Sequence, residues 1–306
     1  MTQSVTATDL PEVGIEDIEF QAEGLDPAAA AACYREHGCL VVRGLLARYA
    51  GPIGEDIMAT VWEAVSLLDR AEPNPNGWRT PDGSLFIQAP AGFERDKQIM
   101  VTSCGYTTSG ALFRSAVDEK LCDVAEAVLG SNVELFMNGQ TLCKEPCGGH
   151  PKMLHQDASY FEHKFDGPMA VLSYAVPTDL ERGALHVVPG SHKLGMLDHV
   201  DTESHLGLPL DAWPWESALP IEGEPGDAIF FHSKTIHGSK PNHSNGPRPV
   251  FIHRYRAADD YIVINATTAE ARKEAEKHAD EAKKENQKGF MVRGRRTHDE
   301  AAEAKS

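Results

Sequence analysis

AIFFHSKTIHGS, residues 228–239, is the stretch that constrains the fold most strongly. Its four apolar residues, 228–231, are typical of a buried strand, and a polar turn then leads to His237, Gly238 and Ser239. Residues two apart in a strand share a face, so the side chains of His237 and Ser239 should enter the same space. The stretch predicts a β core with polar side chains at the end of one strand.

Similar short apolar segments, separated by turn residues, follow residue 130. They span residues 133–142, 169–176, 185–188 and 250–255. The N-terminal half instead shows helical spacing at 28–36, 53–68 and 115–129, with a buried strand at 39–42 and a loop rich in Pro, Gly and Asn at 74–93. Strands clustered behind a helical N-terminal half predict a mostly β fold with flanking helices, an antiparallel sandwich or barrel.

Two histidines and one aspartate form the candidate metal site. His155 and Asp157 lie two residues apart, and His237 can supply the third ligand. His-x-Asp pairs also occur at 199–201, in a long polar loop, and at 278–280, in a helical segment where such residues face nearly opposite sides. Two imidazoles and one carboxylate on one face of a six-coordinate ion leave three open positions, the arrangement of non-haem Fe(II) oxygenases.

Two further side chains can hold a dicarboxylate beside this ion. Arg248 follows His237 by eleven residues, beyond the turn Asn245-Gly246-Pro247. If the turn folds the next strand back beside His237, the guanidinium can bind a carboxylate through two hydrogen bonds. Ser239 can donate a hydrogen bond to the same carboxylate. The open positions of the ion then suit a bidentate cosubstrate and O2.

The chain resembles the phytanoyl-CoA dioxygenase family of Fe(II)- and 2-oxoglutarate-dependent oxygenases over residues 26–256. The resemblance rests on four stretches in this order: YREHGCLVVRG at 34–44, HQD at 155–157, GALHVVPGSH at 183–192, and HGS at 237–239 followed by Asn242, Ser244 and Arg248. It implies a double-stranded β-helix (jelly-roll, cupin-like) core. It also implies Fe(II) on His155, Asp157 and His237.

The same resemblance implies that Arg248 and Ser239 anchor 2-oxoglutarate. The stretch at 133–144 is similar to the first core strand of the family, so Gln140 or Lys144 is expected to face the metal-side carboxylate. The implied reaction oxidises an unactivated C–H bond of a small molecule with O2, converts 2-oxoglutarate to succinate and CO2, and is supported by ascorbate in vitro. Hydroxylation is the expected outcome.

Other outcomes and activities stay open at this point. Desaturation, cyclisation and epoxidation are possible at the same iron site, because substrate placement decides between them. A metal-dependent jelly-roll enzyme without redox chemistry can use the same three ligands, but it does not need Arg248 and Ser239. A binding module that has lost turnover is the third alternative.

Several side chains near the motifs have an expected place. Tyr160 and Phe161 follow the metal pair and are expected to line the substrate pocket. Arg254 and Arg256 alternate with Tyr255, so the two arginines share one face of the strand and are expected to point inward toward an anionic group of the substrate, with one of the two faces of the strand toward solvent. Trp213 and Trp215, in the insertion at 193–220, are expected to serve as a lid or as a hydrophobic plug.

Composition limits the partners. Lys and Arg number 29 against 46 Asp and Glu, a formal net charge of −17, which repels nucleic acid and anionic lipid. Six irregularly placed cysteines predict free thiols in a cytoplasmic protein. No export signal or membrane span is expected, and the oligomeric state stays open. We expect an acidic N-terminal arm at 1–25, a catalytic domain at 26–266 and a charged helical or disordered tail at 267–306.

Overall fold

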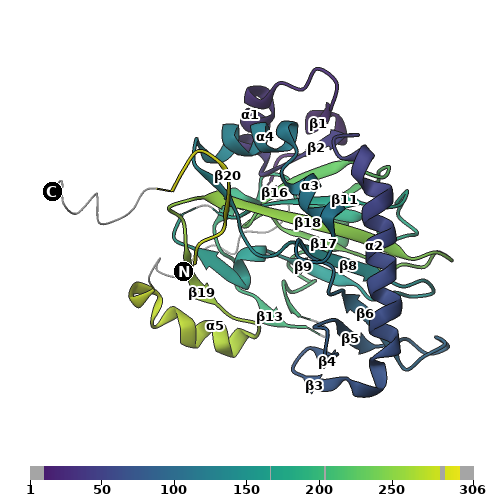
Figure 1. Cartoon of the computed structure of the whole chain (residues 1–306). Coiled ribbons are helices and arrows are strands. Elements are labelled where there is room, and N and C mark those ends of the chain that lie inside the picture. Colours follow the sequence, from purple (N-terminus) through teal and green to yellow (C-terminus); the bar gives the residue numbers. More distant parts are fainter. Residues whose placement is uncertain (1–9, 166, 203–204, 283–286, 297–306) are drawn as a thin grey trace.

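A computed structural model describes residues 10–165, 167–202, 205–282 and 287–296. Two β-sheets face each other, and helices cover the outer face of the larger one (Figure 1). The larger sheet has the strand order β1 (Glu19–Gln21), β2 (Cys39–Arg43), β16 (Ala228–His232), β11 (Met169–Tyr174), β18 (Arg248–Ala257), β8 (Gln140–Lys144), β6 (Lys97–Val101), β5 (Leu85–Gln88), β4 (Gly77–Arg79) and β3 (Glu72–Asn74). β7 (Val133–Leu135) pairs with β18, and β20 (Phe290–Arg293) pairs with β7.

The smaller sheet has the order β15 (Leu219–Ile221), β12 (Leu185–Val187), β17 (His237–Ser239) and β9 (Lys152–His155). Two short antiparallel pairs complete the described strands: β10 (Phe161–His163) with β19 (Ile262–Asn265), and β13 (Val200–Asp201) with β14 (Leu206–Gly207). Most pairings are antiparallel, while β1 and β2 run parallel. The expectation of a mostly β jelly-roll core with flanking helices is confirmed.

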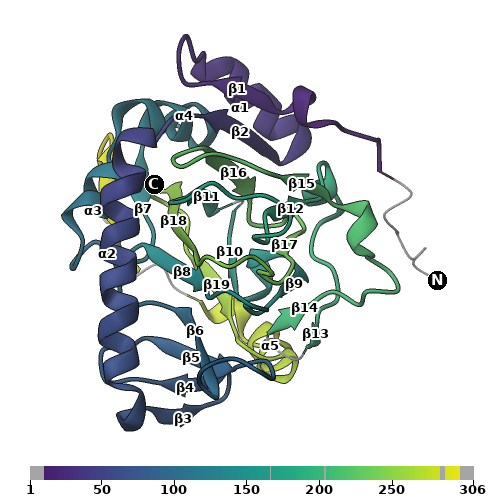
Figure 2. The same cartoon turned by 90° about the vertical axis from the view of Figure 1, so that its right-hand side faces the viewer.

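Both faces of the central strands are buried, which explains their continuous apolar sequences. In β16, Ala228 and Phe230 pack toward the helices, whereas Ile229 and Phe231 pack between the two sheets. The same alternation holds in β2, β11 and β18. The helices that cover the larger sheet are α1 (Pro27–His37), α2 (Ala47–Ser66), α3 (Gly110–Ala116) and α4 (Glu119–Leu129), with α2 running along the sheet on the side away from β9, β12 and β17 (Figure 2).

The predicted helix at 115–129 is wrong in its extent. The structure has two helices there, because the chain breaks at Asp118, whose side chain accepts hydrogen bonds from the amides of Lys120 and Leu121 and so caps α4. The predicted strand at 133–142 is likewise split into β7 and β8, with Met137 between them in a left-handed conformation at φ 68°.

The predicted loop at 74–93 is also wrong in part. It contains all of β4 and β5 and the last residue of β3, and these strands extend the larger sheet at one edge. These strands are short and lie at an edge, where Pro73 in β3 is tolerated. The turn-forming residues of this segment therefore led to the prediction of a loop where the structure has strands.

The insertion at 193–220 carries Trp213, which is 3% exposed and packs in a core cluster with Leu154 and Ile236. Trp213 is therefore a hydrophobic plug rather than a lid.

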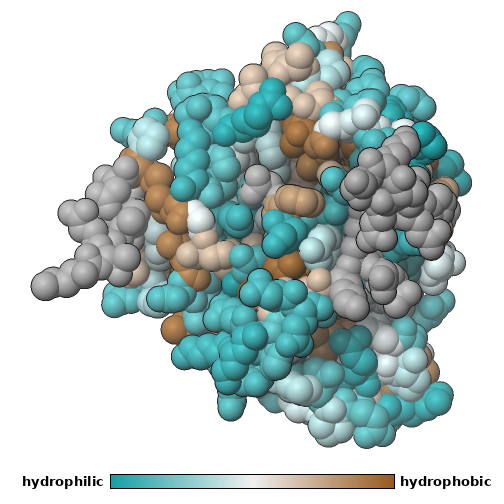
Figure 3. All heavy atoms as spheres, turned by 90° about the vertical axis from the view of Figure 1, so that its left-hand side faces the viewer, coloured by the Kyte–Doolittle hydropathy of each residue, from teal (hydrophilic) through white to brown (hydrophobic). Residues whose placement is uncertain are grey.

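The C-terminal segment adds ordered elements to the fold. The expected helix is present as α5 (Ala269–Glu276), but Phe290–Arg293 forms strand β20 instead of a helix or frayed end. Residues 283–286 and 297–306 lie outside the described residues, as do residues 1–9 of the expected N-terminal arm. The face that carries α5 and β20 is mostly hydrophilic, with scattered hydrophobic patches (Figure 3). All six cysteines are free thiols, as expected. No described helix is long and apolar enough to cross a membrane.

A buried ion pair holds this segment to the larger sheet. Glu134 of β7 is fully buried and accepts hydrogen bonds from Nε of Arg256 at 2.8 Å and from the amide of Gly289 at 3.0 Å. Arg296 also pairs with the Glu134 carboxylate. One carboxylate thus joins β18 to the segment that precedes and follows β20.

We predict that Glu134→Ala destabilises the protein by about 3 to 5 kcal/mol, because it leaves the buried Arg256 guanidinium without its partner. Chemical denaturation checks this value. Glu36→Ala removes the ion pair between Lys193 and Glu36 on the surface and should leave the unfolding midpoint unchanged. Equal midpoints for the two variants would contradict the role assigned to Glu134.

A second prediction concerns His253 of β18, which is fully buried between the hydroxyls of Tyr106 and Ser115, each at 2.9 Å. Burial lowers the pKa of His253 to about 3, whereas an unfolded histidine titrates near 6.5. The unfolded chain therefore binds the extra proton as pH falls below 6.5, and stability is lost by about 1.4 kcal/mol per pH unit for this group. Urea denaturation between pH 6 and 4 gives the free energy of unfolding at each pH. In His253→Gln this free energy should fall by about 1.4 kcal/mol less per pH unit than in the native protein. The same pH dependence in both proteins would contradict the assignment.

Candidate metal centre

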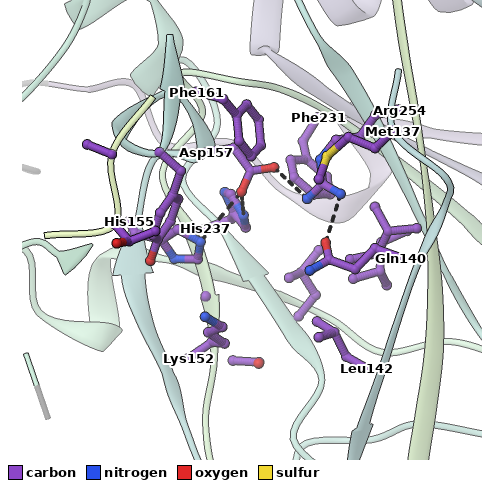
Figure 4. Close-up of a pocket in the computed structure, with 18 of the residues that line it drawn as sticks. Met137, Gln140, Leu142, Lys152, His155, Asp157, Phe161, Phe231, His237 and Arg254 are labelled. Atoms are coloured by element: carbon purple, nitrogen blue, oxygen red, sulfur yellow. Dashed lines mark hydrogen bonds and ion pairs between the residues drawn. The ribbon is translucent and has the colours of Figure 1, made fainter. Parts of the chain in front are cut away.

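The three predicted metal ligands meet at the end of the smaller sheet. His155 is the last residue of β9, His237 is the first residue of β17, and the two residues are direct partners in the antiparallel pairing. Asp157 lies in the single turn that follows β9, Asp157–Ser159. All three side chains are buried, and one ligand atom from each lies within 4.8 Å of the others (Figure 4).

The two imidazoles present the same nitrogen to the centre. Oδ1 of Asp157 lies 3.7 Å from Nε2 of His155 and 3.6 Å from Nε2 of His237. Each Nδ1 lies within hydrogen-bond distance of the carbonyl oxygen two residues earlier, at 2.8 Å from Met153 and 2.9 Å from Thr235. A carbonyl can only accept, so Nδ1 carries the proton and donates it, and the lone pair of each Nε2 faces the other ligands.

Charge around Asp157 keeps its carboxylate ionised. Burial alone favours the protonated acid, but Arg254 and the two histidines outweigh it and lower the pKa of Asp157 far below its usual range. Burial lowers the pKa of His237 to about 3, so this imidazole is neutral at pH 7. A neutral imidazole and an ionised carboxylate are the forms that bind metal ions.

Arg254 was not predicted to act on the metal site. Its guanidinium donates to Oδ2 of Asp157 at 3.0 Å and to Oε1 of Gln140 at 2.8 Å (Figure 4). Arg254 and Arg256 are both buried, but the expectation that one face of this strand meets solvent is wrong, because β18 is covered on both sides. The sequence pattern could not show this, since the cover on the second face comes from segments distant in sequence.

Arg272 of α5 is a second residue that sequence analysis missed. It donates hydrogen bonds to the carbonyl oxygens of Ala158 at 3.0 Å and Ser159 at 3.1 Å, and it pairs with Glu162. These carbonyls belong to the turn that carries Asp157. A helix in the predicted tail therefore fixes the turn of the metal site, and nothing in the charged, alanine-rich sequence indicates this.

The residues expected to hold a dicarboxylate lie in one cavity with the metal ligands. Arg248 is 2% exposed, and its Nε and Nη2 have no hydrogen-bond partner among the described residues. Its guanidinium carbon lies 5.3 Å from the centre of the Tyr174 ring. Ser239 lines the same cavity. A buried donor without a partner raises the free energy of the folded protein. The two such donors of Arg248 therefore indicate a place for a hydrogen-bond acceptor, such as an anionic ligand.

The two residues expected at the metal-side carboxylate differ in position. Gln140 lines the cavity, where its oxygen accepts from Arg254. Lys144 does not line it: its ammonium donates to the carbonyl oxygen of Ser239 at 3.0 Å and to that of Lys240. Lys144 therefore stabilises the backbone at the end of β17, and its side chain does not enter the cavity.

The cavity has a volume of about 280 Å³, at the small end of ligand pockets. Tyr160 and Phe161 line it, as expected, and Phe231, Leu172, Leu185 and Ile252 provide apolar walls. Lys152 of β9 also lines it and was not singled out in the sequence. His199, from the rejected pair at 199–201, accepts a hydrogen bond from the amide of Gln156 at 3.0 Å and so supports the metal loop instead.

Comparison with known proteins gives a consistent result. The family model described as phytanoyl-CoA dioxygenase matches residues 34–250. A probable alpha-ketoglutarate-dependent hypophosphite dioxygenase of Stutzerimonas stutzeri is 33% identical over 165 residues, which cover 50% of this chain and 57% of that protein, less than two thirds of its length. A 1-deoxypentalenic acid 11-beta-hydroxylase of Streptomyces exfoliatus is 33% identical over 270 residues, covering 82% of this chain and 89% of that protein.

A solved structure shows the same relationship in three dimensions. An epimerase from nogalamycin biosynthesis, in complex with Fe3+, alpha-ketoglutarate and nogalamycin RO, is 26% identical with a TM-score of 0.54. The match covers 77% of this chain and 87% of that chain.

We predict that Asp157→Ala and His237→Ala each weaken Fe(II) binding by at least about 100-fold, since each removes one of three ligands. Anaerobic isothermal titration calorimetry measures the affinity. His186→Gln is the matched control, because His186 is a buried histidine on the neighbouring strand β12 that lies outside the cluster. Retention of the native affinity in either ligand variant, or its loss in the control, would contradict this centre.

Proposed function

Because this chain belongs to the phytanoyl-CoA dioxygenase family, we propose that it is an Fe(II)- and 2-oxoglutarate-dependent dioxygenase that hydroxylates a C–H bond of a small-molecule metabolite. One observation carries the proposal. The cluster of His155, Asp157 and His237 shares a single small cavity with the two unpartnered donors of Arg248. A metal ion and a dicarboxylate have complementary partners in that cavity.

The residues fit both groups chemically. Two neutral nitrogen ligands and one carboxylate oxygen are the donor set of non-haem Fe(II), and they leave positions for further ligands. When bound, Fe(II) and 2-oxoglutarate supply the activation of O2, with succinate and CO2 as the products of the cosubstrate. Ascorbate is expected to maintain the reduced metal during assays.

Each protein side chain has a defined task in this proposal. Arg248 and Ser239 bind the distal carboxylate of 2-oxoglutarate, where the guanidinium replaces lost water with charge-assisted hydrogen bonds. Gln140 is oriented by Arg254 beside the metal-side carboxylate, whereas the place of Lys144 gives it no such contact. Arg254 also fixes the carboxylate plane of Asp157 through Oδ2, so that Oδ1 stays directed at the histidines.

The apolar walls keep water away from the reacting groups. Leu172, Leu185, Phe231 and Ile252 surround the polar residues of the cavity. A dry cavity strengthens each electrostatic contact and protects reactive species from side reactions. Substrate placement against these walls decides between hydroxylation and the alternatives of desaturation, cyclisation or epoxidation.

The non-redox alternative is less well supported. A hydrolase or isomerase that uses only the three metal ligands gives no reason for two buried, unpartnered donors on Arg248. The curated relatives are named for different small molecules, hypophosphite and 1-deoxypentalenic acid, which supports a small-molecule substrate without identifying it. A cytoplasmic location and the boundaries of the catalytic domain at 26–266 stay predictions.

An anaerobic titration tests the assignment. Addition of Fe(II) and then 2-oxoglutarate to the protein should produce the weak visible charge-transfer band of a chelated oxoacid. A substrate screen in air with Fe(II), ascorbate and 2-oxoglutarate then reads succinate release and a mass gain of one oxygen, whereas loss of two hydrogens signals desaturation or cyclisation. Metal-loaded, folded protein that shows no band would overturn the proposal.

For Arg248→Ala we predict an increase of at least about 100-fold in the KM for 2-oxoglutarate, because a buried charge-assisted contact to the distal carboxylate is lost. Fe(II) affinity, measured by calorimetry, should stay within about threefold of the native value, since Arg248 does not touch the three ligands. Arg248→Lys should recover only part of the loss, because an ammonium cannot form the two parallel hydrogen bonds. An unchanged KM would exclude Arg248 from the cosubstrate site.

A further inference from the structure

The cavity is cationic although the chain is acidic. Its lining includes Lys152, Arg248 and Arg254 against a single carboxylate, that of Asp157. The whole chain carries a formal net charge of −17. A concentration of positive charge in a small apolar cavity of such a protein requires a reason, because each buried cation loses hydration.

Two of the three cations have a role in the proposed function. Arg254 is paired with Asp157 at 3.0 Å, and Arg248 has free donors suited to the distal carboxylate of 2-oxoglutarate. Fe(II) and the 2-oxoglutarate dianion cancel each other in charge, so loading the site does not neutralise the remaining cation. Lys152 is therefore the one cation of this lining to which the proposed function gives no partner.

Lys152 has no hydrogen bond or ion pair within the part of the chain that the structure describes. Its only recorded partner is the ring of Tyr160, whose centre lies 5.9 Å from Nζ. It is half-buried and directed into the cavity because the pairing of β9 with β17 is irregular between His237 and Ser239. Figure 4 shows it among the lining residues, on the side of the two histidines.

The ammonium of Lys152 remains the main form at neutral pH. Burial lowers its pKa to about 8, although Asp157 opposes the shift. Asn265 and Thr267 line the same cavity and supply hydrogen-bonding groups, while the single carboxylate of the lining, that of Asp157, is already paired with Arg254. An anion of the ligand is the partner that this environment lacks.

We propose, on the basis of the proposed function, that Lys152 binds an anionic group of the primary substrate, a carboxylate or a phosphoryl oxygen. The enzyme thus acts on a small, negatively charged molecule whose reactive C–H bond is held near the metal ligands by this contact. Arg248 serves the cosubstrate and Lys152 serves the substrate. The cavity of about 280 Å³ has room for a small molecule beside the metal ligands.

The test compares matched acidic and neutral probes. Protein loaded with Ni(II) and 2-oxoglutarate, which does not turn over, is titrated by calorimetry with hexanoate against hexanamide, benzoate against benzamide, and methylphosphonate against its dimethyl ester. We expect at least one anion to bind about tenfold tighter than its neutral counterpart, the size expected for one charge-assisted hydrogen bond. Lys152→Met should abolish this preference, and Lys152→Arg should keep most of it.

Two controls separate the possible outcomes. Lys193→Met removes an exposed lysine and should change nothing. The affinity for 2-oxoglutarate should stay within about threefold in Lys152→Met. A tenfold loss of that affinity without loss of anion preference would assign Lys152 to the cosubstrate and overturn the proposal. Absence of any anion preference in the native protein up to concentrations on the order of 10 mM would also overturn it. Failure of the proposed function is seen separately, as a missing charge-transfer band with Fe(II).

Discussion

The ionised carboxylate of Asp157 is the constraint on which the rest of the site depends. One oxygen faces two imidazoles and the other accepts from Arg254, so a buried negative charge is balanced by groups from three segments. Arg254 comes from the larger sheet, whereas the histidines end strands of the smaller one. The contact therefore ties the two sheets together at the point where a metal ion is to be held, and a displacement of either sheet would separate the charge from its partners.

Sequence patterns predicted the centre of the fold because hydrophobic burial is strongest there. β2, β11, β16 and β18 are covered on both faces, and their continuous apolar segments were found at nearly the observed positions. The edges were predicted poorly. β3 and β4 contain Pro, Asn and Gly, which strands at the edge of a sheet tolerate, and the short β5 lies among turn-forming residues. β20 is formed by only a few apolar residues in a charged segment. Pairing with a neighbour, rather than local preference, decides the structure of such strands.

The same division applies to the site. His155, Asp157 and His237 could be predicted because ligand chemistry demands particular side chains at a particular spacing, and Arg248 followed from the need to hold a dicarboxylate. Of the two residues expected at the metal-side carboxylate, Gln140 lines the cavity, whereas the ammonium of Lys144 donates to backbone carbonyls of residues 239 and 240. The alternation around Tyr255 indicated that Arg254 points inward but not what it contacts, and Arg272 carries no spacing signal. The contacts of both join segments about a hundred residues apart, which one sequence does not encode in any local pattern.

The hydrogen bonds of Arg272 to the turn after Asp157 have a consequence for the order in which the molecule is completed. The metal ligands are all synthesised by residue 237, but the helix that holds their turn and the strand anchored by Glu134 are among the last described segments. A chain synthesised only as far as His237 contains all three ligands but lacks these supports. The turn that carries Asp157 therefore becomes fixed only after the segment with Arg272 has been added, later than the ligands themselves.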